Sequence, residues 1–148
     1  MSDQKLTDSQ KLTEALIDAA RSTNLVRVRE LLALGLDPNT PGEWRRTPLP
    51  LAVRYAYSNE AEAIQIVDAL LAAGADVNAS PGDCLSPVRY AAIHGYKDLL
   101  RFLVAAGADV NDRDANGQTV ISMIEGSAAI KHRRRRIVRI LEQAGGVR

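Results

Sequence analysis

Basic residues form an unbroken run from Lys131 to Arg136. A guanidinium group donates paired hydrogen bonds to a carboxylate or a phosphate. The run could therefore contact an acidic protein partner, bind nucleic acid or anionic lipid, or form a solvated end cap that prevents end-to-end stacking. No aromatic residue for base stacking interrupts it, which disfavours a dedicated nucleic-acid site. Its arginines are Arg133, Arg134, Arg135 and Arg136.

The net charge of +1 conceals an asymmetry between two parts of the 148-residue chain. Residues 1–130 hold 12 Lys and Arg against 17 Asp and Glu, a net charge of −5, whereas residues 131–148 hold seven against one, a net charge of +6. An acidic body repels nucleic acid and anionic lipid. The asymmetry therefore favours an acidic protein partner or an end cap as the role of the basic run.

Cys84 and His94 are the residues whose types could support nucleophilic catalysis, because a histidine can take the proton of a cysteine thiol. Cys84 falls in a predicted loop and His94 in the far part of the following helix, so we expect the two side chains to be too distant for a hydrogen bond. The sequence has no glycine-rich phosphate loop, Gly-x-Ser-x-Gly elbow or His-Glu-x-x-His helix. We predict a protein without catalytic residues or cofactors.

Metal binding and cellular compartment are constrained by the same few side chains. Cys84, His94 and His132 are the only cysteine and histidines, too few for a His/Cys metal cluster. A single cysteine allows no intrachain disulfide, which is typical of a reduced, cytoplasmic protein. The polar first residues and the lack of a long apolar run predict neither a secretory signal nor a membrane span.

An internal repeat organises the chain and must position these residues. The pattern Gly-x-Asp-x-Asn follows an apolar segment at Gly35, Gly74 and Gly107, and a weaker fourth copy ends at Gly145. The glycines are 39, 33 and 38 residues apart, so the unit has 33 residues, with insertions of six and five residues in two copies. Asp and Asn side chains bond the local backbone, so the pattern predicts turns rather than metal ligands.

A second marker lies eight residues beyond each Asn of this pattern and predicts helix starts. Thr or Ser accepts hydrogen bonds from free N–H groups there, and Pro suits the first helical position. The copies are Thr47-Pro48-Leu49, Ser86-Pro87-Val88 and Thr119-Val120-Ile121. Together the two markers resemble the ankyrin repeat family over roughly residues 12–146. In that family a finger loop precedes a first helix with Thr-Pro-Leu-His and a second helix that ends before Gly-Ala-Asp-Val-Asn.

The resemblance implies an all-α solenoid of four helix-turn-helix repeats, with finger loops and little or no regular sheet. A polar N-terminal segment, residues 1–11, would precede the repeat domain, residues 12–148. The repeats would span residues 12–41, 42–80, 81–113 and 114–148, and the outer two look like polar caps.

Two departures from the family pattern affect the expected geometry. The histidine of the first helix is absent, so we expect its hydrogen bond to neighbouring turns to be absent too. Its replacements are Pro50, Arg89 and Ser122. Gly117 keeps the finger glycine, whereas Arg45 and Cys84 replace it, so we expect those two fingers to differ in shape.

Partners of the family usually dock on the finger tips and on the concave faces of the first helices. The equivalent positions, our partner-binding candidates, are Glu43, Trp44, Arg46, Arg54, Tyr55, Gly82, Asp83, Leu85, Ile93, His94, Ala115, Asn116 and Gln118. Trp, Tyr and Arg are enriched at binding hot spots. Trp44, the only tryptophan, either recognises a partner or folds back over the core of the first repeat. Tyr55 and Tyr57 either stack on the insertion, where the helix is extended, or widen the contact surface.

Two placements of the last helix give the arginines different surroundings. A helix that begins near Arg135 would crowd them at its positively polarised N-terminus. A longer helix that Ser127 caps and that begins at Ala128 would place them in its middle. We favour the longer helix, because the insertion and the small residues there suit it.

The sequence as a whole predicts a rigid, non-catalytic adaptor or inhibitor that binds one protein and is monomeric when unbound. An immunity-type protein that neutralises a toxin is a narrower hypothesis, which rests on family analogy. The alternative is an anion-binding protein that acts on nucleic acid or anionic lipid through the arginine cluster. The preference for Arg over Lys, with abundant Ala, favours a bacterial source.

Overall fold

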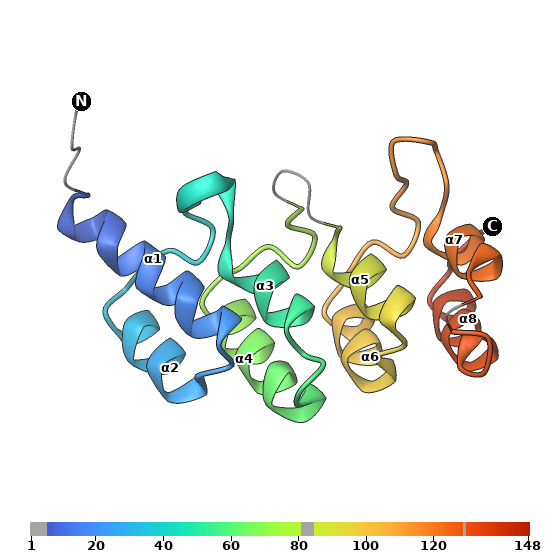
Figure 1. The fold of residues 1–148 in the computed structure, drawn as a ribbon, viewed down its shortest axis with the longest axis horizontal. Helices are drawn as coiled ribbons and strands as arrows, with labels where there is room; N and C mark the ends of the chain where they lie inside the picture. The colour runs from blue at the N-terminus through green and yellow to red at the C-terminus, as the bar shows by residue number, and fades with distance from the viewer. Residues whose placement is uncertain (1–5, 81–84, 129) are drawn as a thin grey trace.

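A computed structural model describes residues 6–80, 85–128 and 130–148, which form a solenoid of four helix pairs (Figure 1). Each helix packs on its pair partner and on the equivalent helix of the next pair. The loops between pairs project to one side as fingers, at the top of Figure 1. First helices are α1 (Asp8–Arg21), α3 (Pro48–Arg54), α5 (Pro87–His94) and α7 (Val120–Gly126). Second helices are α2 (Leu25–Ala33), α4 (Glu60–Ala72), α6 (Lys97–Ala105) and α8 (Arg134–Gln143).

The all-α repeat solenoid predicted from the sequence is confirmed. In the described ranges the fingers contain only a short 3-10 turn, η1 (Glu43–Arg45), and one isolated antiparallel bridge between Arg113 and Thr119. The core is a ladder of equivalent leucines, one near the end of each second helix, all 0% exposed. Burial of each leucine side chain contributes roughly 1.5–3 kcal/mol. The four are Leu31, Leu70, Leu103 and Leu141.

The Asp and Asn residues of the repeat act in turns, as predicted, and the asparagines also join successive repeats. Asn39 Nδ2 donates to the Gly74 carbonyl at 2.8 Å, and its Oδ1 accepts from the Asp76 N–H at 2.8 Å. Asn78 and Asn111 make equivalent contacts to the turns that follow them. Each asparagine therefore ties its own turn to the next one along the solenoid.

The expected loss of the first-helix hydrogen bond is wrong for the third repeat. Arg89 is 2% exposed, and its Nη2 donates to the Asp112 carbonyl at 2.8 Å and lies 3.3 Å from Asp112 Oδ2. The same Oδ2 accepts from Ser86 Oγ at 2.7 Å. The Arg89 side chain reaches the neighbouring turn, to which the family histidine would bond, and contacts Asp112 there. Arg89 therefore holds the base of the finger that opens the fourth repeat.

The longer last helix predicted from Ala128 is also wrong. α7 ends at Gly126 with Ser127 as its C-terminal cap, and α8 begins at Arg134. Ile130, 7% exposed, is buried against the core, and Arg134 Nη2 donates to the Ser127 carbonyl at 3.1 Å. Burial of one isoleucine thus competes successfully with helix propensity, and the arginines stand at the start of α8.

Helices α1 and α4 are the longest in the described part of the chain. α1 begins at Asp8 after the cap residue Thr7, so the boundary expected between residues 1–11 and the repeat domain falls inside this helix. The insertion of the second repeat lengthens α4, which has 13 residues against nine in α2 and α6. The first helix of that repeat, α3, is not extended and has seven residues.

Candidate functional site

Trp44 stands at the tip of the first finger, within η1. Its side chain is 79% exposed, so it does not cover the core of the first repeat. Trp44 and Arg45 have φ angles of 59° and 56°, a left-handed conformation that costs a non-glycine residue roughly 1–2 kcal/mol. The Glu14 carboxylate of α1 accepts a hydrogen bond from the Glu43 N–H and helps to hold this turn. The finger therefore presents Trp44 to solvent at an energetic cost.

The other described finger candidates are exposed and belong to separate fingers. In the third finger Asp114 Oδ1 accepts from the N–H groups of Asn116 and Gln118, both at 2.9 Å, which leaves the two side chains outside. Leu85 is 37% exposed beside the second finger. Glu43, Arg46 and Ala115 are exposed as well. Gly82, Asp83 and Cys84 lie outside the described residues, so the separation expected between Cys84 and His94 stays a prediction.

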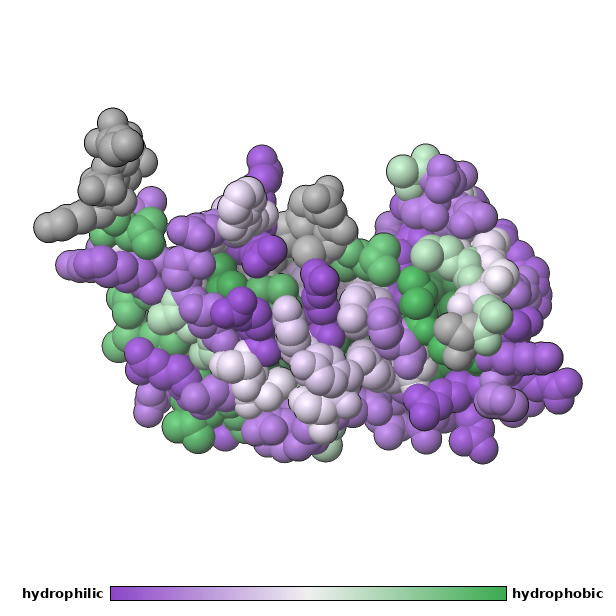
Figure 2. Space-filling view, in the orientation of Figure 1, coloured by the Kyte–Doolittle hydropathy of each residue, from purple (hydrophilic) through white to green (hydrophobic). Residues whose placement is uncertain are grey.

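All four tyrosines of the chain lie within α5 or in the loops that follow α3 and α5. Figure 1 shows these loops at the edge of the solenoid opposite the fingers. Tyr57 is 72% exposed and the other three are half-buried. Pale side chains gather along the lower edge of the molecule in Figure 2. We call this group the tyrosine surface and define it as Arg54, Tyr55, Tyr57, Tyr90, His94 and Tyr96.

Stacking and one hydrogen bond order the centre of the tyrosine surface. The rings of Tyr90 and His94 are parallel within 13°, with centroids 3.9 Å apart, and the His94 ring lies 5.7 Å from that of Tyr96. His94 Nδ1 lies 3.0 Å from the Tyr90 carbonyl, which can only accept, so Nδ1 is the donor. The Tyr55 and Tyr57 rings are 6.2 Å apart. These contacts fix the orientation of the aromatic rings on this surface.

Burial raises the pKa of the Tyr90 hydroxyl, although the positive charge of Arg54 acts in the opposite direction. Burial raises the pKa of Tyr96 as well, and the negative charge of Glu60 adds to this effect. Both hydroxyls therefore stay protonated at neutral pH and can donate a hydrogen bond to a partner.

Sequence reasoning named Arg54, Tyr55 and His94 but missed Tyr90 and Tyr96. One signal was available, because Tyr57 and Tyr96 both lie nine residues after the first-helix proline of their repeats. Tyr55 and His94 are also equivalent, because each lies seven residues after the first-helix proline of its repeat. Tyr90 has no aromatic counterpart in the other repeats, and only the packing of α5 against α3 brings it to the group. Ile93 is half-buried.

The basic cluster, defined as residues 131–136, occupies the turn before α8 and its first residues. Arg134 differs from the other arginines, because it is half-buried and bonds to Ser127. Arg133 lies against Gly95, where an added Cβ would come within 3.0 Å of Arg133 Cδ. Because Gly95 directly follows His94, the basic cluster borders the tyrosine surface.

The described residues offer no group of three His, Cys, Asp or Glu side chains arranged to hold a metal ion. None of the helices within this part of the chain combines the length and the apolar character that a membrane crossing requires.

Comparisons with known proteins agree with the repeat geometry. A family model described as "Ankyrin repeats (many copies)" matches residues 54–103 and 88–123. Zygote-specific protein 3 of Chlamydomonas reinhardtii is 37% identical over 120 residues, which is 80% of this chain and 30% of that protein. Cyclin-dependent kinase 4 inhibitor B of Bos taurus is 32% identical over 111 residues, 74% of this chain and 79% of that protein.

A bacterial relative is similar over a shorter stretch. Putative ankyrin repeat protein YahD of Escherichia coli (strain K12) is 33% identical over 93 residues, 63% of this chain and 43% of that protein. The chain thus spans less than half of the algal and bacterial relatives and most of the inhibitor.

Proposed function

Because the chain belongs to the ankyrin repeat family, we propose that it is a non-catalytic module that binds a protein partner through its tyrosine surface and fingers. The observation that carries this proposal is the gathering of every tyrosine of the chain, with Arg54 and His94, on one accessible edge. Tyr, Trp and Arg dominate binding hot spots. Tyr57 and Trp44 are 72% and 79% exposed, large aromatic groups that a partner would cover.

Preorganisation explains how a small surface could bind well. Freezing a rotamer-rich side chain on binding costs about 0.5–1.5 kcal/mol. Tyr90 is fixed by the stack with His94, and both residues belong to the rigid helix α5. The surface therefore loses little conformational entropy on binding, and its protonated tyrosine hydroxyls donate to partner carbonyl or carboxylate groups.

Inhibition of the partner is the role we favour within this function. A rigid module of four repeats acts most simply by covering a surface that the partner needs, and one of its relatives bears the name of a kinase inhibitor. An adaptor role requires a second partner. The immunity-type hypothesis, in which the covered surface belongs to a toxin, is the narrowest form of the proposal. In each form the module works as a cytoplasmic monomer.

Site-specific photocrosslinking tests the proposal directly. A photoreactive amino acid at position 57 is expected to capture one discrete protein in cells that encode this chain. Val26, 68% exposed on α2, is the matched control position, because it belongs to the first repeat, whereas the tyrosine surface belongs to the second and third. Absence of a crosslink at position 57, or the same products from both positions, would contradict the proposal.

The captured protein then allows an affinity measurement. Tyr57→Ala is expected to weaken binding by roughly tenfold or more, the range of a hot-spot aromatic residue. Val26→Ala should leave affinity unchanged, and thermal unfolding of both variants checks that the fold is intact.

The second candidate function is anion binding, which the basic cluster favours. It predicts binding to nucleic acid or anionic vesicles that weakens steeply with salt and does not depend on Tyr57.

A further inference from the structure

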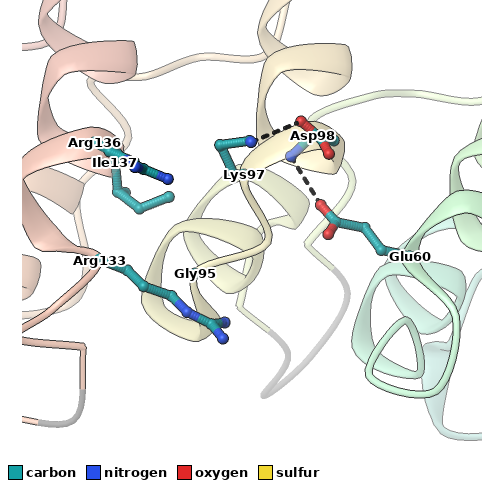
Figure 3. Close-up of a pocket in the computed structure, with 7 residues that line it drawn as sticks. All are labelled: Glu60, Gly95, Lys97, Asp98, Arg133, Arg136 and Ile137. Carbon is teal, nitrogen blue, oxygen red and sulfur yellow. Dashed lines mark hydrogen bonds and ion pairs between the residues drawn. The ribbon is translucent and has the colours of Figure 1, made fainter.

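The basic cluster lines two separate cavities. One, of about 270 Å³, lies between α6 and α8, where Arg136 of α8 points toward Lys97 of α6 and Arg133, which precedes α8, extends along Gly95 (Figure 3). The other, of about 420 Å³, is lined among the described residues by four basic side chains alone. These are Lys131, His132, Arg134 and Arg135. Each cavity is large enough for a carboxylate and its carbon stem.

The acidic side chains beside the first cavity are already engaged. Glu60 Oε1 accepts from the N–H groups of Asp98 and Leu99, both at 2.8 Å. Asp98 Oδ1 lies 3.6 Å from Lys97 Nζ and 3.8 Å from Arg101 Nη1. In the part of the chain that the structure describes, Arg133, Arg135 and Arg136 have no ion-pair partner.

The preceding repeat shows which group complements this position. Glu60 is the first residue of α4, and its carboxylate lies at the start of the next second helix, α6. Lys97 is the first residue of α6 and lies beside the start of α8. The start of α8 has neither an acid in its first turn nor a side-chain cap among the described residues, so no carboxylate there does what Glu60 does at the start of α6.

We infer that the basic cluster binds an acidic segment of the protein partner, with one carboxylate in each cavity. Arg133 and Arg136 bind the first carboxylate, and Arg135 with Lys131 binds the second. Guanidinium groups match carboxylates through paired hydrogen bonds. The inference rests on the proposed function, because Gly95 and Arg133 place the first cavity directly beside the tyrosine surface.

The surroundings of the cluster favour a short acidic peptide over a nucleic acid or a membrane. Outside the basic cluster the chain carries a net charge of −4, which repels an extended polyanion but tolerates a segment confined to two cavities. Residues 130–148 contain no Phe, Tyr or Trp on which a base could stack.

Fluorescence anisotropy with a labelled hexaglutamate peptide, at low and at physiological salt, tests the inference. We expect binding at low salt, and a roughly tenfold loss of affinity in Arg136→Glu and in Arg135→Glu, since each replaces attraction by repulsion. The matched control is Arg29→Glu, the same charge change on α2, where Arg29 is exposed and has no ion pair among the described residues. Its affinity should stay within about twofold.

Three results would overturn the inference. They are the absence of hexaglutamate binding at low salt, an equal loss of affinity in Arg29→Glu, and tighter binding of single-stranded DNA or phosphatidylserine vesicles through the same arginines. Tyr57→Ala separates this inference from the proposed function, because it should spare hexaglutamate binding and weaken binding of the captured protein by roughly tenfold or more. Peptide binding without a crosslinked partner would refute the proposed function alone.

Discussion

The first helix of the solenoid, α1, begins with a complete capping box, whereas the last, α8, begins with arginines and no side-chain cap. Thr7 Oγ1 accepts from the Gln10 N–H at 3.3 Å, the Thr7 N–H donates to Gln10 Oε1 at 2.8 Å, and Asp8 complements the helix dipole. The first turn of α8 holds Arg134, Arg135 and Arg136 and no acid. A locally unfavourable helix start in an otherwise consistent fold is where a functional region is expected, which supports the proposed binding role of these arginines.

The largest expected effect on the free energy of unfolding comes from Arg89, which joins the third repeat to the last one, whose second helix has an unfavourable start. Arg89→Met keeps the length of the buried side chain and removes its donors to Asp112. We expect the free energy of unfolding to fall by about 2 kcal/mol, because the Asp112 carbonyl and its partly exposed carboxylate lose a charged donor. Chemical denaturation measures this change.

Arg29→Met is the matched control, because Arg29 is exposed and lies in the first repeat. Equal stability losses in the two variants would show that Arg89 does not anchor the C-terminal end of the solenoid.

The asparagine bridges provide the next test, because they are equivalent at the two ends. Asn39 joins the first two turns and Asn111 the last two, each through two hydrogen bonds. Asn39→Ala and Asn111→Ala should each lower the free energy of unfolding by about 1.5 kcal/mol. Asn116→Ala, in an exposed part of the third finger, should have little effect. A much smaller loss in Asn111→Ala would mean that the C-terminal bridge is weaker than the structure indicates.

Removal of the favourable cap tests the N-terminal side of the comparison. Thr7→Ala loses the side-chain half of the capping box and should cost about 1 kcal/mol. Thr40→Ala, at an exposed position outside the helices, is the control. Hydrogen exchange should show faster opening of α1 in the first variant, and unchanged exchange there would disprove a stabilising role for the box.

Local patterns made most of the fold predictable. The helix starts at Pro48 and Pro87 follow from proline at the first helical position, and the turns at Asn39 and its equivalents follow from short-range hydrogen bonding. The predicted side-chain cap is wrong for Thr47 and Ser86, which make no capping bond, and is confirmed for Thr119, whose Oγ1 accepts from the Ser122 N–H at 3.2 Å. The start of α8 was missed because the helix propensity around Ala128 competes with the burial of Ile130, and burial depends on the neighbouring repeat. Tertiary contacts commonly override propensity in this way.

The candidate site was only partly predictable for a related reason. Trp44 could be placed by repeat register, but its exposure required the conformation of the finger. Arg89 departs from the family histidine, and sequence reasoning could not show that its longer side chain reaches the next finger. Tyr90 joins the tyrosine surface through the packing of α5 on α3, which no single repeat reveals.

The smallest expected effect has the opposite sign and tests the comparison most directly. Arg136→Glu places an acid in the first turn of α8, where it complements the positive end of the helix dipole and removes repulsion from Arg133. The free energy of unfolding should rise by about 0.5 kcal/mol at low salt and by less at high salt. Arg29→Glu, within α2 rather than in a basic cluster, should not stabilise the protein.

Two measurements on Arg136→Glu decide the comparison. Greater stability together with weaker hexaglutamate binding would show that these arginines serve binding at the expense of stability. A loss of stability would instead mean that Arg136 supports the fold.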